Sequence, residues 1–392
     1  MAFNFIDQAL VQQREQARFR QTTCIEKVDG VKISVAGKAY INFSSNDYLG
    51  LNNNVDIQQA LQQGADRFGT SASASALITG HHYAHQALTD EICDWLNKPR
   101  CLLYSSGFAA NSGALQALGQ KSTCMWLDKL SHASLIDGAL ASNAHLVKRF
   151  KHNSIGHAKQ LLAKQAANQE HQLDNTNAML DHLFVSEGVF SMDGDRAPVA
   201  QLSELARQNN GWLYCDDAHS IGVIGEHGQG SSSFAPVDIV MATFGKAIAS
   251  SGAFIACEDN VAEYLTNFSR HYIYSTAISP AMAWATKRSI ELIRNEHWRR
   301  EKIAQLSHCL IESLDKSVDV LPTESSIHAI VIGCEAKTLK VANALRENGF
   351  WVTAIRPPTV PNNSSRLRVT ITSSHNIQEI KALAKCINKV VH

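Results

Sequence analysis

The 392-residue chain has no excess of charge of either sign. Lys and Arg together number 36 and so do Asp and Glu, which gives a net charge of zero with neutral histidine. A surface without a global field favours neither nucleic acid nor a membrane as partner. The chain also lacks a run of about 20 apolar residues, the length that a transmembrane helix needs. We therefore expect no nucleic-acid or membrane partner.

The nine cysteines form no recognisable motif. The two that lie closest in sequence, Cys93 and Cys101, are too far apart for a C-x-x-C pair. An odd, dispersed set is typical of reduced cytosolic thiols. Residues 1–10 are too short and too polar for the apolar segment of a secretory signal. We therefore expect a cytoplasmic protein.

The sequence pattern predicts an α/β fold. The hydrophobic content of 45% and the charged content of 18% are those of a globular protein. Strand candidates alternate with helical stretches, which predicts βαβ units and a mainly parallel sheet flanked by helices. The candidates are 102–104, 124–127, 183–185, 212–215, 239–243 and 254–257, with a helix expected over 108–118 and another from 134.

The two ends of the chain have other patterns. An amphipathic helix is expected over 3–20, followed by β-like segments at 22–28 and 32–35. A long charged helix (about 284–315) precedes strand candidates at 327–332, 351–353 and 367–371. We predict an N-terminal helix and β arm over 1–45, a large domain over 46–285 and a small α+β domain over 286–392. The Gln- and Asn-rich segment 159–181 is interpreted as a surface helix and loop.

Two strand candidates end in polar side chains. Asp216 to His219 (DDAH) follow one apolar run, and Thr243 to Lys246 (TFGK) follow another. Open α/β sheets bind ligands at the carboxyl ends of their strands. A lysine amine and a carboxylate delivered there suit pyridoxal phosphate (PLP), because the amine forms a Schiff base and the carboxylate pairs with the protonated ring nitrogen.

Other interpretations of these residues remain open. Lys246 could be a solvated surface charge, although its small neighbours favour burial, which makes an amine nucleophilic. A phosphate-binding P-loop does not fit, because Val240 stands where that motif requires glycine. Asp216, Asp217 and His219 could instead bind a hard metal, but no second acidic cluster completes a ligand set.

Three further segments carry possible functions. Residues 106–111 (SGFAAN) lie at a strand-to-helix junction, where free backbone N–H groups bind phosphate, although an ordinary turn is the alternative. His132 follows another strand and is either structural or stacked on a cofactor. His81, His82 and His85 suggest zinc, but no further ligand is evident. Residues 225–230 (GEHGQG) are interpreted as a turn.

Together these motifs resemble the α-oxoamine synthases, which are PLP enzymes of fold type I, the aspartate aminotransferase fold. The resemblance runs essentially from end to end. It is carried by residues 42–50 (NFSSNDYLG), 106–111 (SGFAAN), 131–134 (SHAS), 187–195 (EGVFSMDGD), 216–219 (DDAH), 243–246 (TFGK) and 355–361 (IRPPTVP).

The resemblance implies a role for each matched residue. Catalytic and cofactor-binding roles fall on Lys246 (covalent PLP attachment), Asp216 (pyridine nitrogen), His219 and Ser191 (ring oxygen), His132 (ring stacking), Gly107, Phe108 and Thr243 (phosphate side), and Ser275 and Thr276, reaching the phosphate from a partner subunit. Substrate-binding roles fall on Arg356 (amino acid carboxylate), Arg20, Asn46, His132 and Thr359. No metal is implied.

The chain departs from the family pattern in two places. Relatives carry a glycine-rich stretch where this chain has Ser71 to Ala76 (SASASA), so the loop is expected to be stiffer or differently placed. Ala247 and Ala249 also replace the more usual glycines after Lys246. Neither change touches the groups expected to bind PLP.

The resemblance implies an acyltransferase. It points to the branch that condenses L-alanine with a pimeloyl thioester, on CoA or acyl carrier protein, with release of CO₂ and the free thiol carrier, in biotin biosynthesis. It also implies a homodimer. The alternatives are a glycine-using relative such as 2-amino-3-oxobutyrate CoA ligase, a PLP-dependent transaminase or decarboxylase, and a non-catalytic protein of the same fold.

Overall fold

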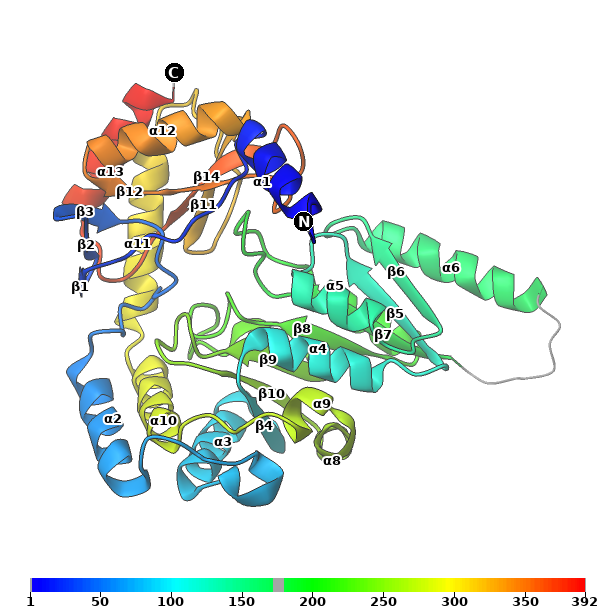
Figure 1. The fold of residues 1–392 in the computed structure, drawn as a ribbon. Helices are drawn as coiled ribbons and strands as arrows, with labels where there is room; N and C mark the ends of the chain where they lie inside the picture. The colour runs from blue at the N-terminus through cyan, green and yellow to red at the C-terminus, as the bar shows by residue number, and fades with distance from the viewer. Residues whose placement is uncertain (1, 172–179, 392) are drawn as a thin grey trace. The chain divides into compact units, whose positions relative to one another are not determined.

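A computed structural model describes residues 2–171 and 180–391 (Figure 1). The chain divides into two compact units. The large unit comprises Asn54–Phe190 and Arg196–His297. The small unit combines the N-terminal segment up to Asn53, the short segment Ser191–Asp195 and the segment from Trp298 onward. The predicted domain boundaries at residues 46 and 286 stay a prediction. The compact units are separated between residues 53 and 54 and between residues 297 and 298.

The large unit is built on a seven-stranded sheet with the order β4-β10-β9-β8-β7-β5-β6. Its pairs are parallel except those of β10, which runs antiparallel to β4 and β9. The strands are β4 (Arg100–Tyr104), β5 (Thr123–Asp128), β6 (Leu146–Phe150), β7 (Asp181–Glu187), β8 (Gly211–Asp216), β9 (Ile239–Thr243) and β10 (Ala253–Cys257). This sheet confirms the predicted fold class.

The helices of the large unit pack on this sheet or on one another. They are α2 (Val55–Phe68), α3 (Tyr83–Leu96), α4 (Gly107–Leu118), α5 (Ala133–Leu140), α6 (Ile155–His171), α7 (Val199–Gln208), α8 (Asp259–Phe268), α9 (Arg270–Ile273) and α10 (Pro280–Asn295). A π-helical turn spans Ala76–Gly80, and a 3-10 turn spans Gly230–Ser233. No helix of the described residues is long and apolar enough to cross a membrane.

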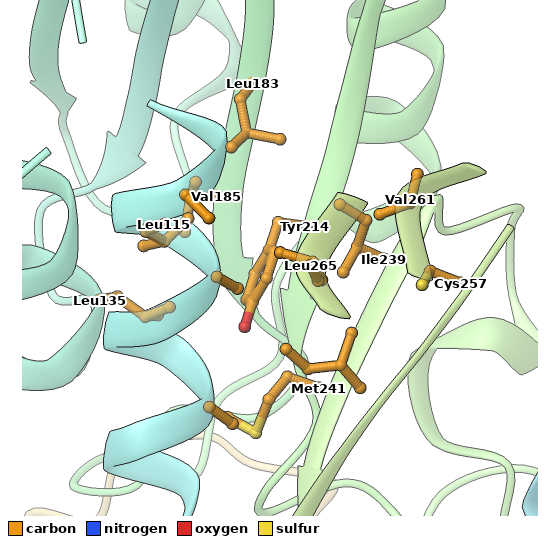
Figure 2. Packing of buried hydrophobic residues seen from close by; sticks show 14 of the residues in the cluster. Leu115, Leu135, Leu183, Val185, Tyr214, Ile239, Met241, Cys257, Val261 and Leu265 are labelled. Atoms are coloured by element: carbon orange, nitrogen blue, oxygen red, sulfur yellow. The ribbon is translucent and has the colours of Figure 1, made fainter. Parts of the chain in front are cut away.

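The core of the large unit follows from strand periodicity. Alternate residues of a strand point to the same face of the sheet. Leu183 and Val185 of β7, Tyr214 of β8, and Ile239 and Met241 of β9 therefore share one face, where they meet side chains of α4, α5 and α8 (Figure 2). The intervening strand residues are buried as well, which explains why these segments are continuous apolar runs.

The small unit holds two short sheets with the orders β1-β2-β3-β12 and β11-β14-β13. Its strands are β1 (Lys27–Asp29), β2 (Lys32–Val35), β3 (Lys38–Asn42), β11 (Ile327–Gly333), β12 (Phe350–Trp351), β13 (Thr353–Ile355) and β14 (Ser365–Thr370). Its helices are α1 (Phe5–Glu15), α11 (Trp298–Ser313), α12 (Glu335–Glu347) and α13 (Ile377–Val390).

Several predicted elements were wrong in detail. The long helix over 284–315 is two helices, because Glu296 leaves the helical conformation after α10. The strand predicted over 351–353 is two strands, since β12 pairs with β3 whereas β13 pairs with β14. The predicted N-terminal helix ends early, at Glu15, and the β-like segment 22–28 forms a strand only from Lys27. Within the segment 159–181, residues 172–179 lie outside the described residues.

Candidate active site

Two carboxylates stand side by side at the ends of neighbouring strands. Glu187 ends β7 and Asp216 ends β8, and the parallel register pairs them directly. Both side chains are almost fully buried. Burial, followed by the nearby Asp216 charge, raises the pKa of Glu187 well above its ordinary value. Burial and the neighbouring carboxylate therefore favour the protonated form of Glu187, and a cationic group bound at this end of the sheet would favour its ionisation.

Lys246 lies in the tight turn that follows β9. Its Nζ is 2.9 Å from Nε2 of His219, which belongs to the turn after β8. The turn is closed by backbone bonds from Ala249 N to the Lys246 carbonyl and from Ser250 N to the Phe244 carbonyl. The structure thus brings together the lysine and the imidazole that the two strand-end motifs deliver.

The adjacent aspartates have different surroundings. Asp216 accepts hydrogen bonds from Asn111 Nδ2 (2.7 Å) and from its own turn at Ala218 N (2.9 Å). Asp217 instead accepts from Ser220 Oγ (2.5 Å) and from Ser231 N (2.8 Å) and Oγ. Burial raises the pKa of Asp217 to about 6. Because Asp216 and Asp217 have separate hydrogen-bond partners, their carboxylates do not bind one ligand together.

The start of α4 offers an anion site. The Ser106 side chain caps the helix by accepting from Ala109 N (3.2 Å), which leaves the N–H groups of Gly107 and Phe108 without a partner among the described residues. A Cβ at Gly107 would overlap Thr243 Cγ2, so only glycine allows the helix to begin this close to the end of β9. The Thr243 hydroxyl is buried and has no partner within the described chain. Two free N–H groups and an orphaned hydroxyl fit a phosphate.

These observations agree with the groups that PLP requires. Lys246 supplies an amine, Asp216 a buried carboxylate, Gly107 and Phe108 free backbone N–H groups, and Thr243 a hydroxyl. His132 lies at the start of α5, where its backbone N–H donates to Glu187 Oε1 (2.6 Å). Its ring meets that of Phe108 edge to face, with centroids 6.4 Å apart. The residues present in the large unit therefore fit this cofactor.

The predicted substrate residues of the small unit form a cationic group of their own. Arg20 Nη2 donates to Thr359 Oγ1 (3.1 Å), and Arg356 donates to the Ala17 carbonyl. Burial and the neighbouring Arg20 charge lower the pKa of Arg356. Two guanidinium groups that repel each other are suited to bind an anionic ligand such as a carboxylate.

The other predicted residues of the small unit surround Arg368. Asn46 Oδ1 accepts from Arg368 Nη2 (3.1 Å), and the Ser191 carbonyl accepts from Arg368 Nε (2.7 Å). The backbone oxygen of Ser191 therefore has a structural role as the acceptor for Arg368.

Ser275 and Thr276 lie in the large unit beside the serine-rich segment. Thr276 forms an isolated antiparallel bridge with Ser75, and Ala277 N donates to the Ala74 carbonyl. Ser73 adopts φ +59, a left-handed conformation that favours glycine. This positive φ stands in the Ser71 to Ala76 stretch, where the resemblance implies a glycine-rich loop in the family.

The three clustered histidines have structural partners. His85 Nδ1 accepts from His82 N (2.9 Å), and its Nε2 donates to the Ile278 carbonyl (2.8 Å). Residues 2–171 and 180–391 contain no group of three or more His, Cys, Asp or Glu side chains that could hold a metal ion. Backbone partners therefore account for both nitrogens of His85.

Sequence reasoning gave no role to Glu187, Asn111, Tyr214 or Ser134. Glu187 could have been found by the strand-end rule that found Asp216, because both follow apolar runs that pair in register. Asn111 was visible only as part of a motif. Its contacts with Asp216, Tyr214 and Ser134 join segments far apart in sequence, so no local sequence pattern predicts these contacts.

Comparison with known families identifies the class. Residues 38–387 match the family model described as aminotransferase class I and II. The serine palmitoyltransferase of Sphingomonas wittichii superimposes with a TM-score of 0.90 at 25% identity, covering 99% of this chain and 96% of that one. The chain is therefore a PLP-dependent enzyme of fold type I, which confirms the predicted cofactor.

Curated relatives narrow the assignment. The 8-amino-7-oxononanoate synthase of Photobacterium profundum is 43% identical over 99% of this chain and 97% of its own length. The enzyme of the same name from Vibrio campbellii is 41% identical over 98% and 97%. A structure so named from Francisella tularensis gives a TM-score of 0.72 at 28% identity, covering 89% of this chain and 97% of that one. The chain belongs to the 8-amino-7-oxononanoate synthase family, and the predicted resemblance is confirmed.

Proposed function

We propose that the protein condenses L-alanine with a pimeloyl thioester to give 8-amino-7-oxononanoate, CO₂ and a free thiol carrier. The observation that carries this proposal is the 43% identity with a curated synthase over 99% of the chain. The acyl carrier is either CoA or acyl carrier protein. The reaction would be a step of biotin biosynthesis.

Lys246 is the proposed covalent attachment point of PLP, and its free amine would be the base that removes the alanine Cα proton. An amine beside the imidazole of His219 is placed to exchange a proton with a neighbouring group. PLP, when bound, supplies an electron sink for the charge left on Cα. Asp216, which accepts two hydrogen bonds at the end of β8, would keep the pyridine nitrogen protonated.

The remaining roles concern binding. Gly107, Phe108 and Thr243 would hold the phosphate, and His132 would cover the ring face. Arg356 would bind the alanine carboxylate, with Arg20, Thr359 and Asn46 on the substrate side. Ser191 would contact the ring oxygen together with His219.

The protein is also proposed to be a cytoplasmic homodimer in which Ser275 and Thr276 reach the phosphate of the partner subunit. The large unit exposes bulky apolar side chains that a second copy could cover. Ile78 is 76% exposed and Tyr274 is 72% exposed. A size measurement in solution should give twice the chain mass of 42.9 kDa, and a mass of 42.9 kDa would contradict the dimer.

A glycine- or serine-using relative is the second candidate. It is favoured by the superposition on serine palmitoyltransferase. A competition assay with alanine, glycine and serine, each with a pimeloyl thioester, separates the two by product mass. Product from alanine supports the proposal, and product from glycine or serine alone would overturn it. Release of free thiol together with CO₂ distinguishes both from a transaminase or simple decarboxylase.

A further inference from the structure

A chain of hydrogen bonds connects Asp216 to His132 through two buried side chains. Asn111 of α4 donates from Nδ2 to Asp216 Oδ2 (2.7 Å) and to Ser134 Oγ (2.9 Å). Ser134 Oγ in turn lies 2.8 Å from His132 Nδ1. Asn111 is 1% exposed and Ser134 is fully buried, so water does not compete for these bonds.

The direction of the chain is set at Asp216. An ionised carboxylate only accepts hydrogen bonds, so the amide of Asn111 must turn its NH₂ group toward Asp216. The opposite orientation would place the amide oxygen against a carboxylate oxygen. The Tyr214 hydroxyl donates to Asn111 Oδ1 (2.8 Å), which agrees with this orientation.

The orientation of Asn111 also determines which atom donates in the hydrogen bond between Ser134 and His132. Ser134 Oγ accepts from Asn111, and its own proton is free to be donated to His132 Nδ1. The backbone N–H of Ser134 also points at Nδ1 (3.3 Å). A ring nitrogen that accepts hydrogen bonds carries no proton, so the proton of the neutral imidazole resides on Nε2.

We propose that Asn111 and Ser134 are positioning residues that fix His132 as the neutral Nε2–H tautomer, with Asp216 setting the direction of the chain. His132 would then act as a hydrogen-bond donor to an oxygen that gains negative charge during thioester attack, and not as a base. This catalytic consequence rests on the proposed function, whereas the tautomer itself does not.

Nuclear magnetic resonance of the holoenzyme, labelled with ¹⁵N in its histidine rings, tests the tautomer directly. His132→Gln identifies the signals of that ring. We expect an unprotonated Nδ1 and a protonated Nε2 in the native protein. In Asn111→Asp the donor facing Ser134 becomes an acceptor, so the serine proton should turn to it and the His132 proton should move to Nδ1.

Tyr214→Phe is the matched control, because it removes a bond to the same Asn111 without reversing any donor beyond it. Its His132 signals should stay as in the native protein. Should Asn111→Asp not fold, Ser134→Ala leaves only the longer backbone bond to Nδ1, and both tautomers should then be present.

A native His132 protonated on Nδ1 would overturn the proposal. So would an unchanged Nε2–H signal in both Asn111→Asp and Ser134→Ala. Turnover of alanine by the same samples is measured separately, and the variants should lower kcat more than they raise KM. A native Nε2–H tautomer in a protein that makes no product from alanine would refute the proposed function and leave this inference standing.

Discussion

The two units of the chain present their polar groups in different ways. In the large unit, the groups proposed to bind PLP stand at the ends of neighbouring parallel strands or at the start of a helix packed on them. Lys246 is hydrogen-bonded to His219, and Asp216 is hydrogen-bonded to Asn111. In the small unit, Arg20 and Arg356 lie in segments without regular structure, where Arg20 is exposed and Arg356 is half-buried.

This difference indicates that the two units have different roles, with cofactor binding in the large unit and binding of the substrate anion in the small unit. A rigid set of buried groups can hold a cofactor and stabilise charge, because its dipoles need not reorganise during the reaction. One exposed and one half-buried arginine are better suited to the binding and release of a substrate anion. Changes in the large unit should therefore affect kcat, and changes in the small unit should affect KM.

The largest effect is expected for Lys246→Ala. Losing both the attachment point and the base should reduce kcat by at least about 10³-fold, the order expected for one well-placed acid–base group. The visible absorbance of bound PLP should change as well. Lys159→Ala on α6 is the control and should leave both unchanged. A variant at Lys246 that retains normal turnover would refute the assigned role.

Asp216→Asn and Asp217→Asn form the sharpest pair within the large unit. Asp216→Asn should lower kcat by about 10²-fold, because the amide cannot keep the pyridine nitrogen charged. Asp217→Asn should leave kcat within a few-fold and instead cost about 1–3 kcal/mol of stability, since its partners Ser220 and Ser231 lose a buried acceptor. Steady-state kinetics and urea unfolding of both variants test these expectations. A loss of kcat in Asp217→Asn but not in Asp216→Asn would contradict the assigned roles.

The small unit contains a buried histidine that makes stability depend on pH. His328 of β11 is 1% exposed, and neither ring nitrogen has a partner within the described chain. Burial lowers the pKa of His328 to about 4. The unfolded chain takes up this proton below about pH 6.5, whereas the folded chain takes it up only near pH 4. The free energy of unfolding therefore keeps its full value above about pH 6.5 and decreases as the pH falls toward 4.

His328→Leu should remove the contribution of this imidazole to the pH dependence of stability. Between pH 7 and pH 5 the native protein should lose about 2 kcal/mol more unfolding free energy than the variant, as measured by urea denaturation. The exposed His145→Leu serves as control and should follow the native curve. Equal pH dependence in the native protein and in His328→Leu would show that the imidazole is not excluded from water.

Arg356→Lys should raise KM for alanine about tenfold and change kcat less, because a lysine cannot bind a carboxylate through two parallel bonds. Arg346→Lys on α12 is a control in the same unit, since that guanidinium lies over the Trp351 ring. A fall in kcat without a change in KM would contradict the division of labour between the units.

The smallest effect concerns the departure from the family pattern after Lys246. Ala249 adopts φ +51, where a side chain is strained and glycine is not. Ala249→Gly should therefore raise the free energy of unfolding by about 1 kcal/mol. Ala256→Gly in the middle of β10 should lower it instead. If Ala249→Gly is also destabilising, the turn is not strained.

Much of the large unit could be predicted from the sequence because its signals are local. Apolar runs ending in DDAH and TFGK identify strand ends, and the helix start at Gly107 follows from a breaker after a strand. What could not be predicted depends on contacts between distant segments. The contact of Asn111 with Asp216 and the division of residues 351–353 between two sheets follow from tertiary pairing alone.

The central claim is that the Lys246 amine is the covalent attachment point of PLP. Borohydride reduction of the purified protein, followed by proteolysis and mass spectrometry, tests it without any assay of turnover. We expect a pyridoxyl group on the peptide that contains Lys246 and on no other peptide. A modified lysine elsewhere, with Lys246 unmodified, would contradict it.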